Sequence, residues 1–233
     1  RYIIATVGMA LVAVGIALTI ISNLGTAPLS CPAYVAALKV KTISVGTFTL
    51  IINMVYMLVQ IAVLRRRFKA RYWLQIAASI LLGYMIDGAL ALLDWLHPDT
   101  IFERLSLVVL SCAVTAVGIS MELVAKAWML SAEMTVNVLS REYGWDFSRV
   151  KIIMDSSLVV LSMSACFLFF RNFFGYGRFT GLADVLLART EGVVTGIGTL
   201  ISAFLVGLMM KLTTPFFEKI MARIRVGKTW RAY

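Results

Sequence analysis

Six long apolar blocks constrain this chain more than any other feature of its sequence. The hydrocarbon core of a bilayer takes about 20 apolar residues per helix. Hydrophobic residues make up 61% of the 233 residues and charged residues 15%, against roughly 45–50% and 25% in soluble domains. We therefore predict one all-α membrane domain over residues 1–233, with transmembrane helices at about 3–24, 45–64, 73–96, 105–128, 152–170 and 193–212.

Two short segments interrupt the alternation of spans and loops. One, at 29–40, follows a break at Gly25 and Pro28, where the first helix cannot continue without interruption. The other, at 131–140, follows the fourth span. Each is either a broken helix at membrane depth, where it lines a cavity, or an interfacial helix on the membrane surface. Lys39 suits lipid headgroups and favours the interfacial alternative for the first segment.

The lysine and arginine residues set the orientation, because cytoplasmic loops retain positive charge. With the N-terminus inside, fifteen basic residues fall on the inner side, six fall outside, and Lys211 lies within the membrane. A basic cytoplasmic tail is predicted at 216–233. The first apolar block is too long for a cleaved signal peptide. Because the net charge of +10 comes from these flanking residues, the predicted partner is the lipid bilayer, and no nucleic acid is expected.

The two halves of the chain are similar. The letters AVGI occur at 13–16, before the first break, and again at 116–119, before the second. Gly83 and Asp87 of the third span correspond to Gly207 and Lys211 of the sixth. Each half therefore has a long helix, a short piece and two more long helices, over 1–100 and 101–215. Three spans is an odd number, so the second half enters the membrane inverted. Such inverted repeats build a midplane site in many secondary transporters; chance similarity between apolar segments is the alternative.

Three short motifs carry a resemblance to a known group of proteins. They are Leu24-Gly25-Thr26-Ala27-Pro28, Ser44-Val45-Gly46-Thr47-Phe48, and Leu82-Gly83 followed by Asp87. On these residues the chain resembles the YitT/YczE/YyaS group of largely uncharacterised bacterial membrane proteins, and the likeness extends to Ile197-Gly198-Thr199-Leu200. The second half departs from the pattern, with Ser148-Arg149-Val150-Lys151 in place of an S-x-G-T start. The resemblance implies a bacterial inner (plasma) membrane protein with a suspected transport role.

Polar residues inside apolar spans are costly, so each one is a candidate for function. The predicted substrate- or ion-binding residues are Asn23, Gly25, Pro28, Asn53, Asp87, Glu122, Glu133, Asn137, Asp155 and Lys211. Asp87 and Glu133 are the predicted proton or cation sites. Asp87 and Lys211 either pair or line one cavity, or else lie separately near opposite headgroup layers. Glu122 and Lys126 have the i, i+4 spacing of an intrahelical ion pair, which competes with a ligand-binding role.

The two breaks favour opposite charges. Thr26 or Ser30 could cap the short helix after the first break and direct its N-terminal amides at an anion. Glu133 stands at the second break and favours a cation or a proton. Together these features suit a zwitterion such as an amino acid.

Enzyme chemistry is not predicted, because the sequence has no P-loop, no GxSxG, no HExxH and no CxxC. Three scattered cysteines and the single His97 make a metal or cofactor site improbable. We therefore predict a gradient-driven transporter of a small polar or ionic solute. The alternatives are a substrate-binding membrane subunit with separate energising partners, or an accessory protein or enzyme of lipid or natural-product metabolism. With no long soluble loop to recruit a partner, a monomer or a homodimer is expected.

Overall fold

A computed structural model describes residues 2–40, 42–68, 70–125, 130–145, 147–173 and 193–225. Within these residues the chain is helical apart from short connections and an isolated bridge residue at Val193. The helices are α1 (Tyr2–Ser22), α2 (Cys31–Lys39), α3 (Val45–Leu64), η1 (Arg65–Arg67), η2 (Ala70–Trp73), α4 (Leu74–Leu92), α5 (Ile101–Ala125), α6 (Ser131–Tyr143), α7 (Phe147–Phe170) and α9 (Ile197–Arg225).

Six of these helices, α1, α3, α4, α5, α7 and α9, are long and apolar enough to cross a membrane. The prediction of a multi-pass helical membrane protein is confirmed. A helix is the expected form for such segments, because lipid offers no partner for an unpaired backbone N–H or C=O group. Lys126, the predicted partner of Glu122, lies outside the described residues.

Local signals in the sequence account for several helix ends. The side chain of Ser44 caps α3 by accepting a hydrogen bond from the Thr47 N–H at 3.1 Å. Pro32 occupies the first turn of α2, where a missing N–H costs little. Gly144 ends α6 with a left-handed backbone, φ +67°. The expected caps of α2 are not formed, because Ser30 donates instead to the Ala27 carbonyl at 3.0 Å.

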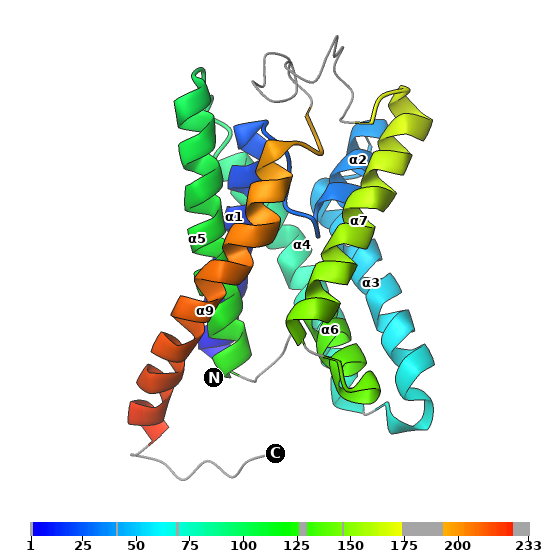
Figure 1. The fold of residues 1–233 in the computed structure, drawn as a ribbon, viewed down its shortest axis with the longest axis vertical. Helices are drawn as coiled ribbons and strands as arrows, with labels where there is room; N and C mark the ends of the chain where they lie inside the picture. Colours follow the sequence, from blue (N-terminus) through cyan, green and yellow to red (C-terminus); the bar gives the residue numbers. More distant parts are fainter. Residues whose placement is uncertain are drawn as a thin grey trace.

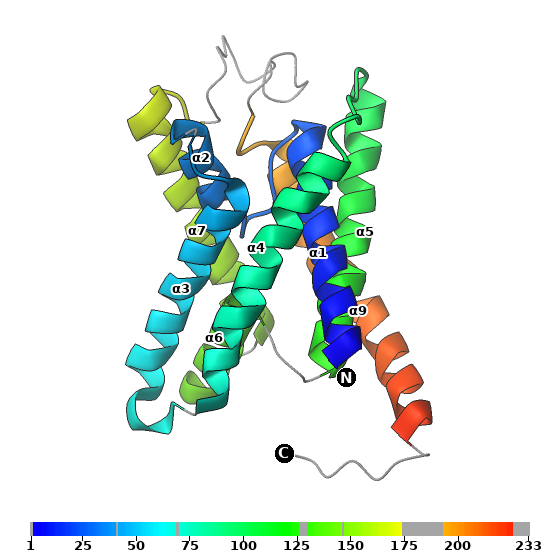
Figure 2. The same cartoon turned by 180° about the vertical axis from the view of Figure 1, so that it is seen from behind.

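The helices form two groups joined by α4. On one side α1 packs along α5, and α5 packs along α9; on the other side α3 contacts α2 and α6, and α7 contacts both short helices (Figures 1 and 2). Helix α4 lies between the groups and contacts α1 and α3. Helix α2 lies toward the upper end in Figure 1 and α6 toward the lower end.

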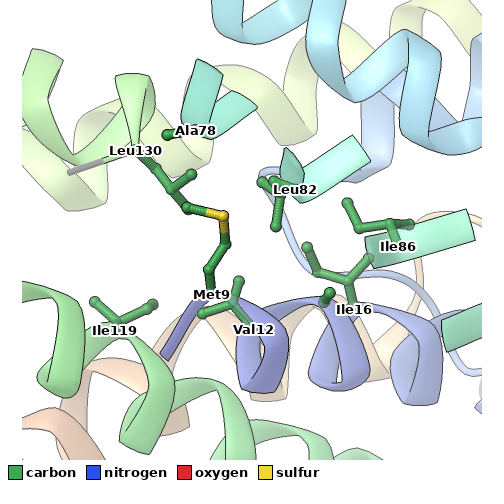
Figure 3. Packing of buried hydrophobic residues seen from close by; sticks show 9 residues of the cluster. Met9, Val12, Ile16, Ala78, Leu82, Ile86, Ile119 and Leu130 are labelled. Atoms are coloured by element: carbon green, nitrogen blue, oxygen red, sulfur yellow. The ribbon is translucent and has the colours of Figure 1, made fainter. Parts of the chain in front are cut away.

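The main apolar core lies where α1, α4 and α5 meet. Met9, Val12 and Ile16 of α1 face Leu82 and Ile86 of α4, all of them almost fully buried (Figure 3). Ile119 of α5 and Leu130, just before α6, complete the cluster. This core joins the start of α6 to the central helices.

Two boundaries differ by five residues or more from those predicted. Helix α9 continues to Arg225, past the predicted end at residue 212 and through Pro215, so the first ten residues of the predicted tail are helical. The Thr213 hydroxyl donates to the Met209 carbonyl at 3.0 Å and lies 2.6 Å from the Ser120 hydroxyl of α5, which holds this turn in place despite the proline. Helix α7 begins at Phe147, before the predicted start at 152.

The contact between α3 and α4 depends on two glycines. A Cβ atom added at Gly83 would lie 2.9 Å from the Gly46 carbonyl oxygen, closer than real Cβ contacts, and one added at Gly46 would overlap the Gly83 carbonyl. Small residues of this kind let membrane helices approach backbone to backbone.

We expect Gly83→Ala to destabilise the folded protein by about 1–3 kcal/mol through overpacking. Gly88→Ala on the same helix is the matched control, because its Cβ would meet nothing within 4 Å and alanine favours a helix over glycine by about 1 kcal/mol. The apparent Tm of both variants in detergent checks this. Equal effects of the two substitutions would contradict the close packing.

Candidate functional site

Polar side chains follow the buried face of α3 at helical spacing. Thr49, Asn53, Tyr56 and Gln60 are each 9% exposed or less, and their spacing of three or four residues places them on one face. Because α3 contacts α2, α4 and α6, this face points into the protein.

A network of amide and hydroxyl groups fixes the start of α6 against α3 and α4. Gln60 and Gln75 form a reciprocal amide pair at 3.0 Å. The Gln60 side-chain nitrogen also lies 3.0 Å from both the Ser131 carbonyl and the Thr135 hydroxyl. Buried amides with satisfied partners hold one geometry, so this network positions the first turn of α6. Neither glutamine is among the predicted binding residues.

Glu133, in that first turn of α6, is buried at 5% exposed. Its Oε2 atom has no hydrogen-bond partner among the described residues. Its electrostatic neighbours are Lys151 and Asp155 of α7, Tyr56 of α3 and Glu122 of α5. Burial raises the pKa of the Glu133 carboxyl, and the nearby Lys151 ammonium opposes that shift in part.

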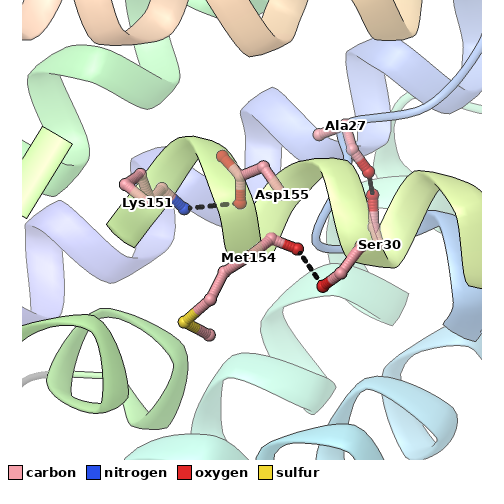
Figure 4. Close-up of polar contacts among 6 residues, drawn as sticks. Ala27, Ser30, Lys151, Met154 and Asp155 are labelled. Carbon is pink, nitrogen blue, oxygen red and sulfur yellow. Dashed lines mark hydrogen bonds and ion pairs between the residues drawn. The ribbon is translucent and has the colours of Figure 1, made fainter. Parts of the chain in front are cut away.

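Lys151 and Asp155 form an ion pair along α7. The Lys151 Nζ atom lies 3.0 Å from the Asp155 Oδ1 atom, and the two side chains are 26% and 15% exposed. Figure 4 shows the pair beside the turn that joins Ala27 to Ser30, just before α2. Lys151 is therefore a partner in the interior cluster, although its place in the sequence indicated a membrane-flanking charge.

Asn53 is the most incompletely bonded residue of the cluster. It is 1% exposed, and neither its Nδ2 nor its Oδ1 atom has a partner among the described residues. Leaving a buried polar group unpaired costs about 1–3 kcal/mol, so an orphaned amide marks a place where another molecule can bind. Asn53 lies one turn before Tyr56, which packs against Ala132 and Leu158.

Glu122 lies near the C-terminal end of α5, which packs along α1. It is 2% exposed and its Oε1 atom has no described partner. A Cβ atom added at Gly8 of α1 would lie 3.2 Å from its Cγ atom. The predicted pairing with Lys126 falls outside the described residues.

The predicted residues at the first break have structural roles. Asn23 has a positive φ of 53°, and its Oδ1 atom accepts a hydrogen bond from the Val193 N–H at 3.1 Å. The Thr26 N–H donates to the Val194 carbonyl at 2.9 Å, and the Gly198 N–H donates to the Leu24 carbonyl at 2.8 Å. The unwound segment is thus satisfied by a second one, at the start of α9.

Gly25 and Pro28 determine the backbone path of the unwound segment after α1. Gly25 has φ +124°, and a Cβ atom there would lie 2.7 Å from the Gly196 nitrogen. Pro28 is buried in the turn that leads to α2. Neither residue offers a side-chain group to a ligand.

Asp87 caps a helix and does not join the polar cluster. Its Oδ2 atom accepts a hydrogen bond from the Ser44 hydroxyl at 2.6 Å, and its Oδ1 atom accepts one from the Gly46 N–H at 2.9 Å. Lys211 is exposed on α9, and no ion pair joins it to Asp87 within the described residues. Of the alternatives, direct pairing of these two residues is not formed, because the Asp87 carboxylate is bonded to the start of α3 and Lys211 is exposed on α9.

Asn137 is half-buried one turn after Glu133 on α6. Of the predicted set, the structure places Glu122 and Asp155 within electrostatic range of Glu133. Asn53 lies one turn before Tyr56, on the face of α3 that packs on Ala132 of α6. Sequence reasoning missed Tyr56 and Lys151. A tyrosine in an apolar span resembles a core residue, and a lysine near a span's end resembles a topology signal. The i, i+4 spacing of Lys151 and Asp155 was the available clue.

These features define the class of the protein: a multi-pass α-helical membrane protein with buried carboxyl and amide groups at Asn53, Glu122 and Glu133 and a partly buried ion pair between Lys151 and Asp155. Residues 1–215 match the family model DUF6198, described as a family of unknown function, and the protein belongs to that family. No curated protein and no solved structure matches the chain. The resemblance to the YitT/YczE/YyaS group stays a prediction.

We expect the stability of the wild type to fall, relative to Glu133→Gln, as the pH rises above the usual glutamate pKa of about 4.3. The folded protein, with the raised pKa of Glu133, keeps a proton that the unfolded chain releases near its usual pKa of about 4.3. Stability is therefore lost across the window between the two pKa values. Melting in detergent at several pH values checks this, with Glu142→Gln at the exposed end of α6 as the control. Parallel curves for wild type and Glu133→Gln would contradict a buried neutral carboxyl.

Asp87→Asn should lower stability by about 1–2 kcal/mol, because one carboxylate acceptor is replaced by an amide donor facing the start of α3. It should leave any ligand binding by the Glu133 cluster unchanged. Asp94→Asn, in the exposed region just beyond α4, is the matched control. Ligand affinity that falls with Asp87→Asn but not with Asp94→Asn would restore Asp87 to the site.

Proposed function

We propose that this protein is a gradient-driven transporter of a small polar or ionic solute, and that the solute binds in the cluster around Glu133, Asn53 and the Lys151–Asp155 pair. The observation that carries the proposal is the buried, unpartnered polar atoms of Asn53 and Glu133. A chain that needed these groups only for packing would do better with apolar residues or with complete hydrogen bonding.

An inverted repeat is the second part of the proposal. Helices α1–α2–α3 and α5–α6–α7 share the order long, short, long. Helix α1 packs on α4 as α5 packs on α9, and α2 contacts α7 as α6 contacts α3. The starts of α2 and α6 are buried, whereas their last residues are exposed and lie toward opposite ends of the bundle (Figure 1). These correspondences support two halves, 1–100 and 101–215, related by a pseudo-two-fold axis in the membrane plane.

The cluster draws on both proposed halves. Asn53 and Tyr56 come from the first, and Glu133, Lys151 and Asp155 come from the second. A solute held between two such halves could be exposed to either side in turn if the halves rock against each other. One contact is much weaker than its counterpart: α3 packs closely on α4 through Gly46 and Gly83, whereas α7 barely touches α9. That asymmetry is what a protein caught open to one side would have.

The proposed location is a bacterial inner (plasma) membrane, with the chain termini in the cytoplasm. The first turn of α1 and the last turns of α9 lie at one end of the bundle, together with the arginines of η1 at 65–67 (Figure 1). Basic residues at that end support a cytoplasmic assignment.

Solute counterflow is the decisive experiment. A thermal-shift screen of amino acids, amines, small acids, vitamins, nucleosides and inorganic ions would first identify a ligand, since a ligand that binds only the native state raises apparent stability. Proteoliposomes loaded with that unlabelled ligand should then accumulate labelled ligand from outside. Asn53→Ala should abolish this accumulation, and Asp94→Asn should not.

A substrate-binding subunit is the second candidate, and one observation favours it. In α9 only 6% of the apolar window is buried within the chain, against 56% in α1, which leaves a long face available for an energising partner. Tight ligand binding without counterflow by the purified protein would favour this candidate over the transporter.

A further inference from the structure

We propose that the solute carries an ammonium group, received by Glu133 and Asn53 within the cluster. This inference rests on the proposed function, because it names the chemical class of the solute that the site would take.

Once the two carboxyl groups have released their protons, the hydrogen-bonding capacity left open in the cluster is mostly that of acceptors. Glu133 Oε2, Glu122 Oε1 and Asn53 Oδ1 each lack a partner among the described residues, whereas Asn53 Nδ2 is the one open donor of these three side chains. An ammonium group has three donors and no acceptor. It complements such a site, whereas a carboxylate or phosphate would leave the open acceptors unpaired.

The charges of the cluster point the same way. Lys151 is already neutralised by Asp155 at 3.0 Å, so the pair adds no net attraction for an anion. Glu133 remains as an acidic group of α6 without such a partner in the described residues, and Glu122 lies near enough to interact with it. When Glu133 is ionised, an arriving cation is the group that restores neutrality in this buried site.

The start of α6 does not attract an anion either. A free helix N-terminus binds anions through its unpaired N–H groups and the positive end of the helix dipole. Here the first turn of α6 carries an acidic side chain of the protein itself, Glu133, whose carboxyl interacts with its own backbone N–H. An acidic group of the protein therefore already occupies this terminus.

A bare metal ion fits the cluster poorly. No group of three or more His, Cys, Asp or Glu side chains gathers in the described part of the chain, and hard cations need several oxygen ligands at once. A metal ion would also leave the Asn53 Nδ2 donor unpaired. A solute with an ammonium group and a nearby acceptor, such as a hydroxyl, carbonyl or carboxylate, would satisfy both ends of the Asn53 amide.

Apolar and aromatic side chains pack next to Glu133 in the sequence and in space, around Ala132 of α6. Tyr56 packs with Ala132 and Leu158, and Leu29, Ile52 and Met154 adjoin them. Such a lining suits the carbon skeleton of an organic amine, and an aromatic ring attracts an ammonium by about 0.5–2 kcal/mol.

The test is a set of matched compounds that differ only in the ammonium or the carboxylate. For the alanine, leucine and phenylalanine skeletons we would compare the amino acid, the α-hydroxy acid in which a hydroxyl replaces the amino group, and the amine that lacks the carboxylate. Binding to the full chain in detergent would be measured as the rise in apparent Tm and as Kd from tryptophan fluorescence. We expect ammonium compounds to bind and the hydroxy acids to bind at least tenfold more weakly. Preference for the amine identifies a cationic solute, and preference for the amino acid identifies a zwitterion.

Variants distinguish a loss of ligand binding from a loss of folding. Glu133→Gln should raise the Kd of ammonium compounds at least tenfold, while Asp94→Asn should leave it unchanged. If Glu133→Gln does not fold, as judged by gel filtration, Glu133→Asp keeps the charge in a displaced position and should weaken binding while retaining the preference for ammonium.

Failure of this inference differs from failure of the proposed function. Equal or tighter binding of the hydroxy acids, or selective binding of an anion or a neutral sugar from the broad screen, would overturn the ammonium assignment; counterflow of that compound would leave the transporter proposal standing. Absence of binding and counterflow for every compound in both panels would count against both.

Discussion

The crossing of α1 and α5 is the contact on which the other helices depend. A Cβ atom at Gly118 would lie 2.5 Å from the Gly8 carbonyl, so the two backbones meet directly at this point. In a bilayer the hydrophobic effect does not drive helices together, and close packing at small residues replaces it. Helix α1 also packs against α4, through the core around Met9 and Leu82, and α5 packs against α9. The positions of the two short helices depend on α1 and α5, because α2 comes directly after α1 in the chain and α6 directly after α5.

Breaks at membrane depth are tolerated here because each one finds protein partners. The segment after α1 bonds to the segment before α9, through the Leu24 carbonyl and the Thr26 N–H. At the other short helix, Gln60 lies beside the Ser131 carbonyl and the Thr135 hydroxyl. These bonds hold the buried starts of α2 and α6 in place and leave the polar groups next to them, Glu133 and Asn53, with unused bonding capacity. Satisfied backbone and unsatisfied side chains in one region are the physical basis for proposing a binding site there.

Spacing and apolar length predicted much of the fold, and polar residues predicted part of the site. Six spans, two short helices and the break at Gly25 follow from residue order alone, because a bilayer forces apolar segments of this length into helices. Asn53, Glu122, Glu133 and Asp155 were indicated by the cost of burying polar groups. Asp87 was indicated by the same rule, but the rule cannot tell a helix cap from a ligand group. Its hydrogen bonds to Ser44 and Gly46 depend on how α3 and α4 cross.

The sequence by itself determined that this protein lies in a membrane, which segments cross it, and which polar residues need a reason to be there. Those properties depend on composition and on distances along the chain. The tertiary structure decided which polar residues meet. It placed Tyr56 within electrostatic range of Glu133 and Asp155, paired Lys151 with Asp155, and kept Asp87 and Lys211 unpaired with each other. Convergence of side chains from α3, α6 and α7 depends on helix packing angles and on contacts between distant residues, which no local pattern in the sequence encodes.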